Sequence, residues 1–106
     1  MIDPKFLGSK KIAVIFKKQY DERTQFIKGR NAQTLLWLAD KGEGGVTAQE
    51  VSSWALRLGA YIFTLRHSNG LNIATIREPH DGGNHARYIL REAIEITQII
   101  PQPVLT

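Results

Sequence analysis

The sequence predicts an α+β fold in which three short helices precede a two-stranded β-hairpin, with extra strands near both ends. Its 106 residues match the usual size of a single domain, so one hydrophobic core is expected. Between residues 31 and 67 the apolar residues recur with the 3.6-residue period of amphipathic helices. After Gly70 the period falls to two, which is typical of half-buried strands.

Composition excludes several classes of protein. With 42% hydrophobic and 23% charged residues, the chain is neither disordered nor fibrous. No apolar run reaches the roughly 18 residues of a membrane helix. Residues 1–9 lack the apolar stretch of a signal peptide, so we expect a soluble, cytoplasmic protein with no membrane partner. The absence of cysteine excludes disulfides, thiolate zinc sites and cysteine nucleophiles.

Positive charge is confined to two segments. Residues 1–30 carry eight lysines and arginines against three acids, a net charge of +5, and residues 57–91 have a net charge of +3. Residues 31–56 and 92–106 each have a net charge of −2. This separation is expected of a protein with one side that faces an anion, although chance clustering on a solvated surface gives the same counts.

The basic N-terminal arm, residues 1–30, is expected to hold one strand. Residues 1–9 predict a loose leader. Residues 10–17 place five consecutive apolar residues, rich in strand formers, between lysines and therefore predict a strand. The polar stretch from residue 19 to 29 predicts no element.

A first helix is expected from residue 31 to Lys41. Asn31 can cap its start, and Gly42 can end it. Four apolar residues follow the i, i+3, i+4, i+7 spacing of a buried helix face: Ala32, Leu35, Leu36 and Ala39.

A second helix of about two turns is expected to follow. Val46 can first pair briefly as a strand. Thr47 and Glu50 then match the capping box, in which each side chain binds the other's free backbone amide. Val51 and either Trp54 or Ala55 would face inward.

The third helix is expected from Arg57 to about His67, before the stop signal Asn69-Gly70. Its inward face carries Leu58, Tyr61, Ile62 and Leu65. Its outward face carries Ala60, Phe63, Thr64 and His67, with Arg57 and Arg66 on the flanks. An outward Phe63 implies that a partner or the N-terminal arm covers it, or that the helical phase is wrong by one position.

A hairpin is expected over residues 71–91. Leu71 and Ile73 alternate with polar or small residues, residues 79–84 turn the chain, and Tyr88 and Leu90 share a face of the returning strand.

The C-terminal segment, residues 92–106, is expected to form one more strand at about residues 93–99, before Pro101 ends it. An unpaired apolar strand is an aggregation hazard, so this strand and the one at residues 10–17 need cover. They pair with each other within one chain or across a homodimer. We favour the homodimer because the small recognition surface of a single domain would bind its target weakly, and two such surfaces would bind it more tightly.

Three helices followed by a hairpin, with a tight turn between the second and third helices, is the order of a winged helix-turn-helix. Five segments carry the resemblance: Val46–Val51, Arg57–Ile62, Leu65–His67, Gly70–Ile73 and Arg87–Leu90. On these motifs residues 31–91 resemble the small winged-helix domains of bacterial and phage proteins. The turn at residues 53–56 departs from the wider pattern because it has no glycine. The resemblance implies double-stranded DNA binding, with helix 57–68 in the major groove and hairpin 71–91 as the wing.

Ten residues on the helix and the hairpin are the predicted DNA contacts: Arg57, Ala60, Thr64, Arg66, His67, Arg77, His80, Asn84, His85 and Arg87. Arg57 lies at the positive end of its helix, where a cation is slightly unfavourable, so a phosphate or a guanine edge would favour it there. An ordinary salt bridge with Glu50 would do the same.

No catalytic, metal or cofactor site is expected, because the three histidines match no known ligand spacing and nothing brings serine, histidine and aspartate together. The sequence therefore predicts a DNA-binding accessory factor of bacterial or phage transcription or replication. The alternative is a protein-protein interaction or dimerisation module without DNA binding, which the sparse polarity of the outward helix face favours.

Overall fold

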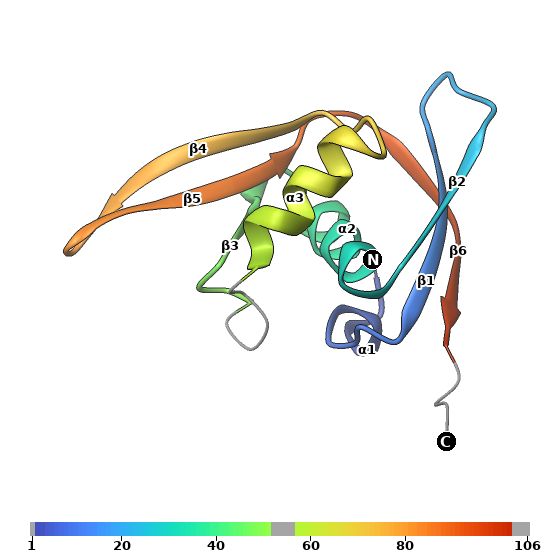
Figure 1. Ribbon diagram of the computed structural model, residues 1–106, viewed down its shortest axis with the longest axis horizontal. Helices are drawn as coiled ribbons and strands as arrows, with labels where there is room; N and C mark the ends of the chain where they lie inside the picture. Colours follow the sequence, from blue (N-terminus) through green and yellow to red (C-terminus); the bar gives the residue numbers. More distant parts are fainter. Residues whose placement is uncertain (1, 52–56, 103–106) are drawn as a thin grey trace.

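The computed structural model describes residues 2–51 and 57–102 (Figure 1). Two antiparallel sheets, with the strand orders β2-β1-β6 and β3-β5-β4, lie on either side of the central helices α2 and α3. The elements have the following bounds: α1 Pro4–Leu7, β1 Ile12–Lys18, β2 Thr24–Lys28, α2 Gly29–Lys41, η1 Gly42–Gly44, β3 Val46–Thr47, α3 Leu58–His67, β4 Ile73–His80, β5 Gly83–Leu90 and β6 Ile94–Pro101.

One hydrophobic cluster joins these elements. It reaches from the inner face of β1 through α2 and α3 to the base of the hairpin. Its large, fully buried members include Ile12, Val14, Phe16, Leu35, Leu36, Leu38, Val46, Leu58, Ile62 and Leu65. The N-terminal arm therefore supplies part of the core.

The expectation of a loose leader at residues 1–9 is wrong. Pro4 starts the short helix α1, and the Lys5 backbone N–H donates to Asp3 Oδ1 at 3.0 Å as an N-terminal cap. The carbonyl of Leu7 accepts from Gln33 Nε2 and Trp37 Nε1, both at 2.7 Å, which fastens α1 to α2. A four-residue helix is too short to show a hydrophobic period, so the sequence pattern missed it.

The strand predicted at residues 10–17 is confirmed as β1, and the strand predicted at 93–99 is confirmed as β6, which extends to Pro101. They pair with each other within one chain, in a register that places Ile12 opposite Pro101 and Val14 opposite Ile99. β2, which no pattern predicted, pairs with the other edge of β1. The expected homodimer required these two strands to pair between chains. Because they pair within one chain, they give no support for a homodimer.

Helix α2 begins at Gly29, two residues before the predicted cap. Asn31 therefore lies inside the first turn, and its Oδ1 is buried without a hydrogen-bond partner among the described atoms. The expectation that Asn31 caps the helix is wrong because β2 runs directly into α2 at Lys28, leaving no room for an extended cap at residue 31. The predicted stop at Gly42 is confirmed, with φ +53°.

The capping box forms only in part. The Glu50 N–H lies 3.4 Å from Thr47 Oγ1, but the Glu50 carboxylate binds Arg87 instead of the Thr47 backbone amide. Residues 48–51 form a turn, so the helix does not start at Thr47 as expected. The remainder of the predicted second helix, with Trp54, Ala55 and the glycine-free turn, lies outside the described residues.

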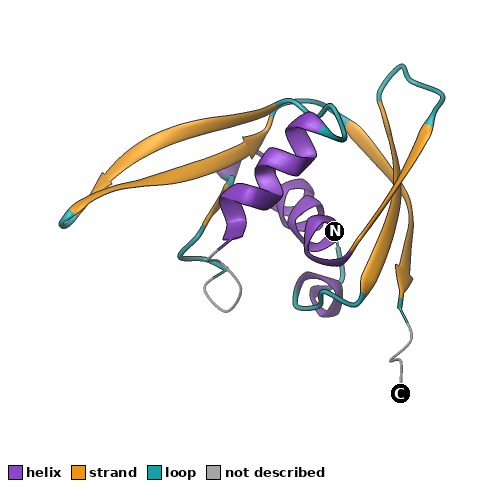
Figure 2. Ribbon diagram, in the orientation of Figure 1, coloured by secondary structure: helices purple, strands orange, loops and turns teal. Residues whose placement is uncertain are grey.

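Helix α3 has the predicted phase. Leu58, Ile62 and Leu65 are buried, and Phe63 is 62% exposed, so the interpretation that the phase is off by one position is wrong. The hairpin is confirmed as β4 and β5, and Figure 2 shows it projecting beyond the helices. Its strands run further than expected, to the pair His80–Gly83. The predicted six-residue turn is therefore only the two residues Asp81 and Gly82, where Gly82 takes φ +87°.

Candidate nucleic-acid interface

The exposed side of α3 is the first part of the candidate interface. Ala60, Phe63 and His67 are exposed along it, and Thr64 is half-buried. The Phe63 and His67 rings lie 4.2 Å apart, one helical turn from each other. The Thr64 hydroxyl donates to the carbonyl of Ala60 at 3.1 Å, so its oxygen is left as an acceptor that faces outward.

An open depression of about 370 Å³ lies where this side of α3 meets the start of α2. It is lined by Arg30, Asn31, Arg57, Ala60, Tyr61 and Thr64. Three predicted contact residues thus meet in one place, together with residues from α2 that the sequence argument did not include. Arg57 is exposed and forms no ion pair with any residue the structure describes. The alternative role for Arg57 in a salt bridge with Glu50 fails because Arg87 takes Glu50, at 3.2 Å.

Arg66 points away from the exposed side of α3. Its Nε and Nη2 donate to the carbonyl of Ile73 at 2.9 and 2.7 Å, and Nη2 also donates to Thr75 Oγ1 at 2.5 Å. These bonds fix the end of α3 to the start of β4. A contact between Arg66 and DNA would have to compete with them.

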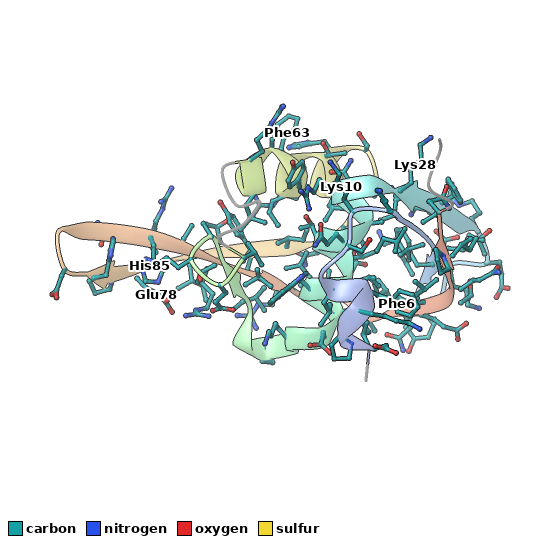
Figure 3. All side chains as sticks on the ribbon, turned by 90° about the horizontal axis from the view of Figure 1, so that it is seen from below. Phe6, Lys10, Lys28, Phe63, Glu78 and His85 are labelled. Carbon is teal, nitrogen blue, oxygen red and sulfur yellow. The ribbon has the colours of Figure 1, made fainter. Side chains whose placement is uncertain are left out.

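The hairpin divides its predicted residues into two groups. Arg77, His80 and Asn84 are exposed towards its tip. His85 and Arg87 instead face Glu78 across the two strands. Glu78 Oε2 accepts from Arg87 Nε at 2.9 Å, and His85 Nε2 lies 2.9 Å from Glu78 Oε1 (Figure 3).

These contacts shift the pKa values of Glu78 and Arg87. Hydrogen bonds from Arg87 and then from His85 hold the pKa of the Glu78 carboxyl below its usual value of 4.5. The bond to Glu78 likewise raises the pKa of Arg87. Arg87 also donates to the carbonyl of Gly44 at 2.8 Å, so it connects β5 to the segment before β3. These contacts therefore use the Arg87 side chain to hold the fold together.

His80 and His85 face each other across the two strands of the hairpin. The rings of His80 and His85 lie 5.1 Å apart in a T-shaped arrangement, and His85 Nδ1 is buried without a described partner. Across residues 2–51 and 57–102, no three histidine, aspartate or glutamate side chains gather closely enough to hold a metal ion.

A family model described as a winged helix domain matches residues 24–100. This chain belongs to the winged helix domain family. The match begins before residue 31 and ends after residue 91, so it takes in β2 and almost all of β6 as well as the segment that carried the resemblance. Comparisons with curated proteins and with solved structures give no match. Within the described part of the chain, no helix combines the length and apolar character needed to cross a membrane.

The sequence argument named no individual basic residue of the N-terminal arm as a contact. Lys10, Lys11, Lys17 and Lys28 form no ion pair with a described residue. Lys28 and Phe63 project from the same broad side of the molecule (Figure 3). The net charge of +5 over residues 1–30 pointed to this segment. It could not single out Lys28, because Lys28 lies on β2, a strand that the sequence did not predict.

Proposed function

We propose that this winged helix domain binds double-stranded DNA, with α3 in the major groove and the β4–β5 hairpin along the neighbouring backbone or minor groove. The main support for the proposal is that α3 has one buried face and one exposed face. Three of its residues are buried in the core, and its opposite side is open to solvent over its full length. A major groove about 12 Å wide admits one such helix.

The open side of α3 offers groups suited to base edges. The Thr64 oxygen is an acceptor because its proton is used by Ala60, which suits the amino groups of adenine or cytosine. The Ala60 methyl suits a thymine methyl, and Arg57 is free of acids among the described residues and suits guanine or phosphate.

The hairpin supplies the phosphate contacts. Arg77, His80 and Asn84 are exposed near its tip, beyond the helices. Phosphate contacts fix orientation and carry no sequence information, so these residues position the domain while α3 reads the sequence. We further propose that the protein is a cytoplasmic accessory factor of bacterial or phage transcription or replication, and that it acts by binding alone, without catalysis.

A mobility-shift assay at two salt concentrations tests this function. We expect the chain to retard genomic duplex fragments at low salt, with log K falling by about 0.9 per phosphate contact for each tenfold rise in salt. Arg57→Ala should flatten this slope by about that amount. Absence of any shift at low ionic strength would overturn the proposal.

One observation favours a protein-binding module instead. Phe63 is 62% exposed at the centre of the open side of α3, where a groove-reading helix usually presents polar groups. In that case Phe63→Ala would abolish capture of a protein partner and leave a weak, unspecific DNA affinity unchanged. In the DNA function we expect Phe63→Ala to weaken duplex binding together with Thr64→Ala.

A further inference from the structure

The outer face of the β2-β1-β6 sheet carries none of the ten predicted DNA contacts. Side chains alternate along each strand, so Ile12, Val14 and Phe16 of β1 enter the core and Ile15 and Lys17 point to the other side. On β2, Phe26 and Lys28 share this outer side, because Phe26 lies opposite Ile15 in the strand register. On β6 it carries Glu95, Gln98 and Ile100.

Phe26, on the edge strand β2, presents an exposed aromatic ring on this face. It is 58% exposed, next to the half-buried Ile15. Exposing a large apolar ring to water is unfavourable, and a ring that is not buried contributes little to the stability of the fold. Its ring lies at a free edge of the sheet, because β2 pairs only with β1 among the described strands.

Tyr20, in the turn between β1 and β2, is a second unexplained aromatic side chain. It is 96% exposed and has φ +66°, a left-handed conformation that is unfavourable for a residue with a Cβ. The ring makes no packing contribution that would offset this backbone cost.

The charge around Phe26 favours an anion. Lys28 is two residues away on the same strand, and Lys17 lies opposite Thr24 on the neighbouring strand. Neither lysine forms an ion pair with the residues that the structure describes. The acid on this face, Glu95, lies on β6, opposite Lys17. The positive charge is therefore concentrated on the β1–β2 half, where Phe26 is located.

We infer that this half of the sheet binds single-stranded nucleic acid. An unpaired base stacks on the Phe26 ring, Tyr20 receives a further base, and Lys17 and Lys28 neutralise the phosphates on either side. Stacking on an exposed aromatic side chain tolerates any base, and cations beside it attract the backbone. A duplex does not suit this face because its bases already stack on each other. A second copy of the chain would bring two further lysines against Lys17 and Lys28, which is electrostatically unfavourable.

Fluorescence anisotropy on the full chain tests the inference, with a labelled single strand of about 16 nucleotides of mixed sequence at roughly 50 mM salt. We expect Phe26→Ala to weaken binding of this strand at least about fivefold and to change the affinity for a duplex of the same sequence less than twofold. Lys28→Ala should lower the salt dependence of single-strand binding.

Phe63→Ala is the matched control, because it removes an equally exposed phenylalanine from α3. It should leave single-strand binding unchanged. A wild-type chain that does not bind the single strand, or a Phe26→Ala chain that binds it within twofold of wild type, overturns the inference. So does a dimer in sedimentation that Phe26→Ala converts to a monomer, because a second copy would then occupy the face. Duplex binding, measured in parallel with Arg57→Ala, succeeds or fails independently of these results.

Discussion

At the residue scale, the arginines of this domain divide by what they contact. Arg66, Arg87 and Arg91 donate to carbonyls or carboxylates of other elements. Arg87 and Arg91 connect segments 43 and 48 positions apart, whereas Arg66 reaches Ile73, seven positions away. Arg57 and Arg77 are exposed and make no ion pair with a described side chain. Charge alone therefore does not identify a DNA contact. The cations that phosphates can recruit without cost to the fold are those with no internal partner.

Gly45 should tolerate no side chain. It is buried with φ +68°, and an added Cβ would lie 2.8 Å from the Tyr88 carbonyl oxygen. We expect Gly45→Ala to lower the free energy of unfolding, measured in urea, by about 2 to 4 kcal/mol. Gly59→Ala is the control. Its added Cβ would meet only Tyr88 Oη, at 3.8 Å. We expect this substitution to raise the free energy of unfolding by up to about 1 kcal/mol. Equal losses for the two variants would contradict this account.

The Glu78 network should make stability depend on pH. Because the folded state lowers the pKa of Glu78, its stabilising contribution is present above the usual value of 4.5 and is lost as the pH falls through the folded value. We expect Glu78→Gln to be less stable than wild type at pH 7. The difference should shrink towards zero as wild-type Glu78 becomes protonated. Urea unfolding of both proteins at pH 7 and pH 3 measures this, and a difference that is the same at both pH values would argue against it.

At the element scale, long periodic segments could be predicted and short ones could not. The ten residues of α3 show almost three helical turns, so their pattern gave both the helix and its exposed side, and with it the meeting of Arg57, Ala60 and Thr64. The five residues of β2 give too short an alternation to be recognised. Partners from other elements, such as Glu78 for Arg87 or Ile73 for Arg66, depend on tertiary packing, which no local pattern encodes.

Helix and hairpin should contribute differently to DNA recognition. We expect Arg57→Ala and Thr64→Ala to change which sequences a selection from random duplexes recovers, because α3 reads base edges in the proposed function. Arg77→Ala should weaken all sequences alike and reduce the salt slope by about 0.9. Arg87→Ala should mainly lower the stability of the fold, since its charge is used by Glu78 and Glu50. Equal changes of sequence preference in the helix and hairpin variants would reject this division.

At the scale of the whole molecule, the terminal strands complete the domain. β1 lies between β2 and β6, and Val14 and Phe16 face Ile99 and Ile96 across the sheet. Ile27 of β2 joins the same cluster as Leu35 and Leu36 of α2. A sheet made from both ends of the chain therefore forms one wall of a core whose other walls are helices from its middle.

Residues 31–91 should not fold alone. Without β1, β2 and β6, the buried faces of α2 and α3 would lose Ile12, Val14, Phe16 and Ile27 and be open to water. We expect this fragment to show no cooperative thermal transition by circular dichroism, whereas the full chain unfolds in one step. A cooperative transition for the fragment would show that the helices and hairpin form an independent core.

The pairing of β1 with β6 also determines when the protein can fold. Thr97 donates its hydroxyl proton to the Ile15 carbonyl across 82 positions of sequence. At a synthesis rate of about 5 to 20 residues per second, the ribosome needs roughly 4 to 16 seconds to make the partner of a strand it has already released. During that interval the apolar run of β1 is a nascent segment with one edge open. The β2-β1-β6 sheet can therefore be completed only once β6 has been made, and until then the open edge of β1 is the kind of unpaired β-edge that chaperones shield.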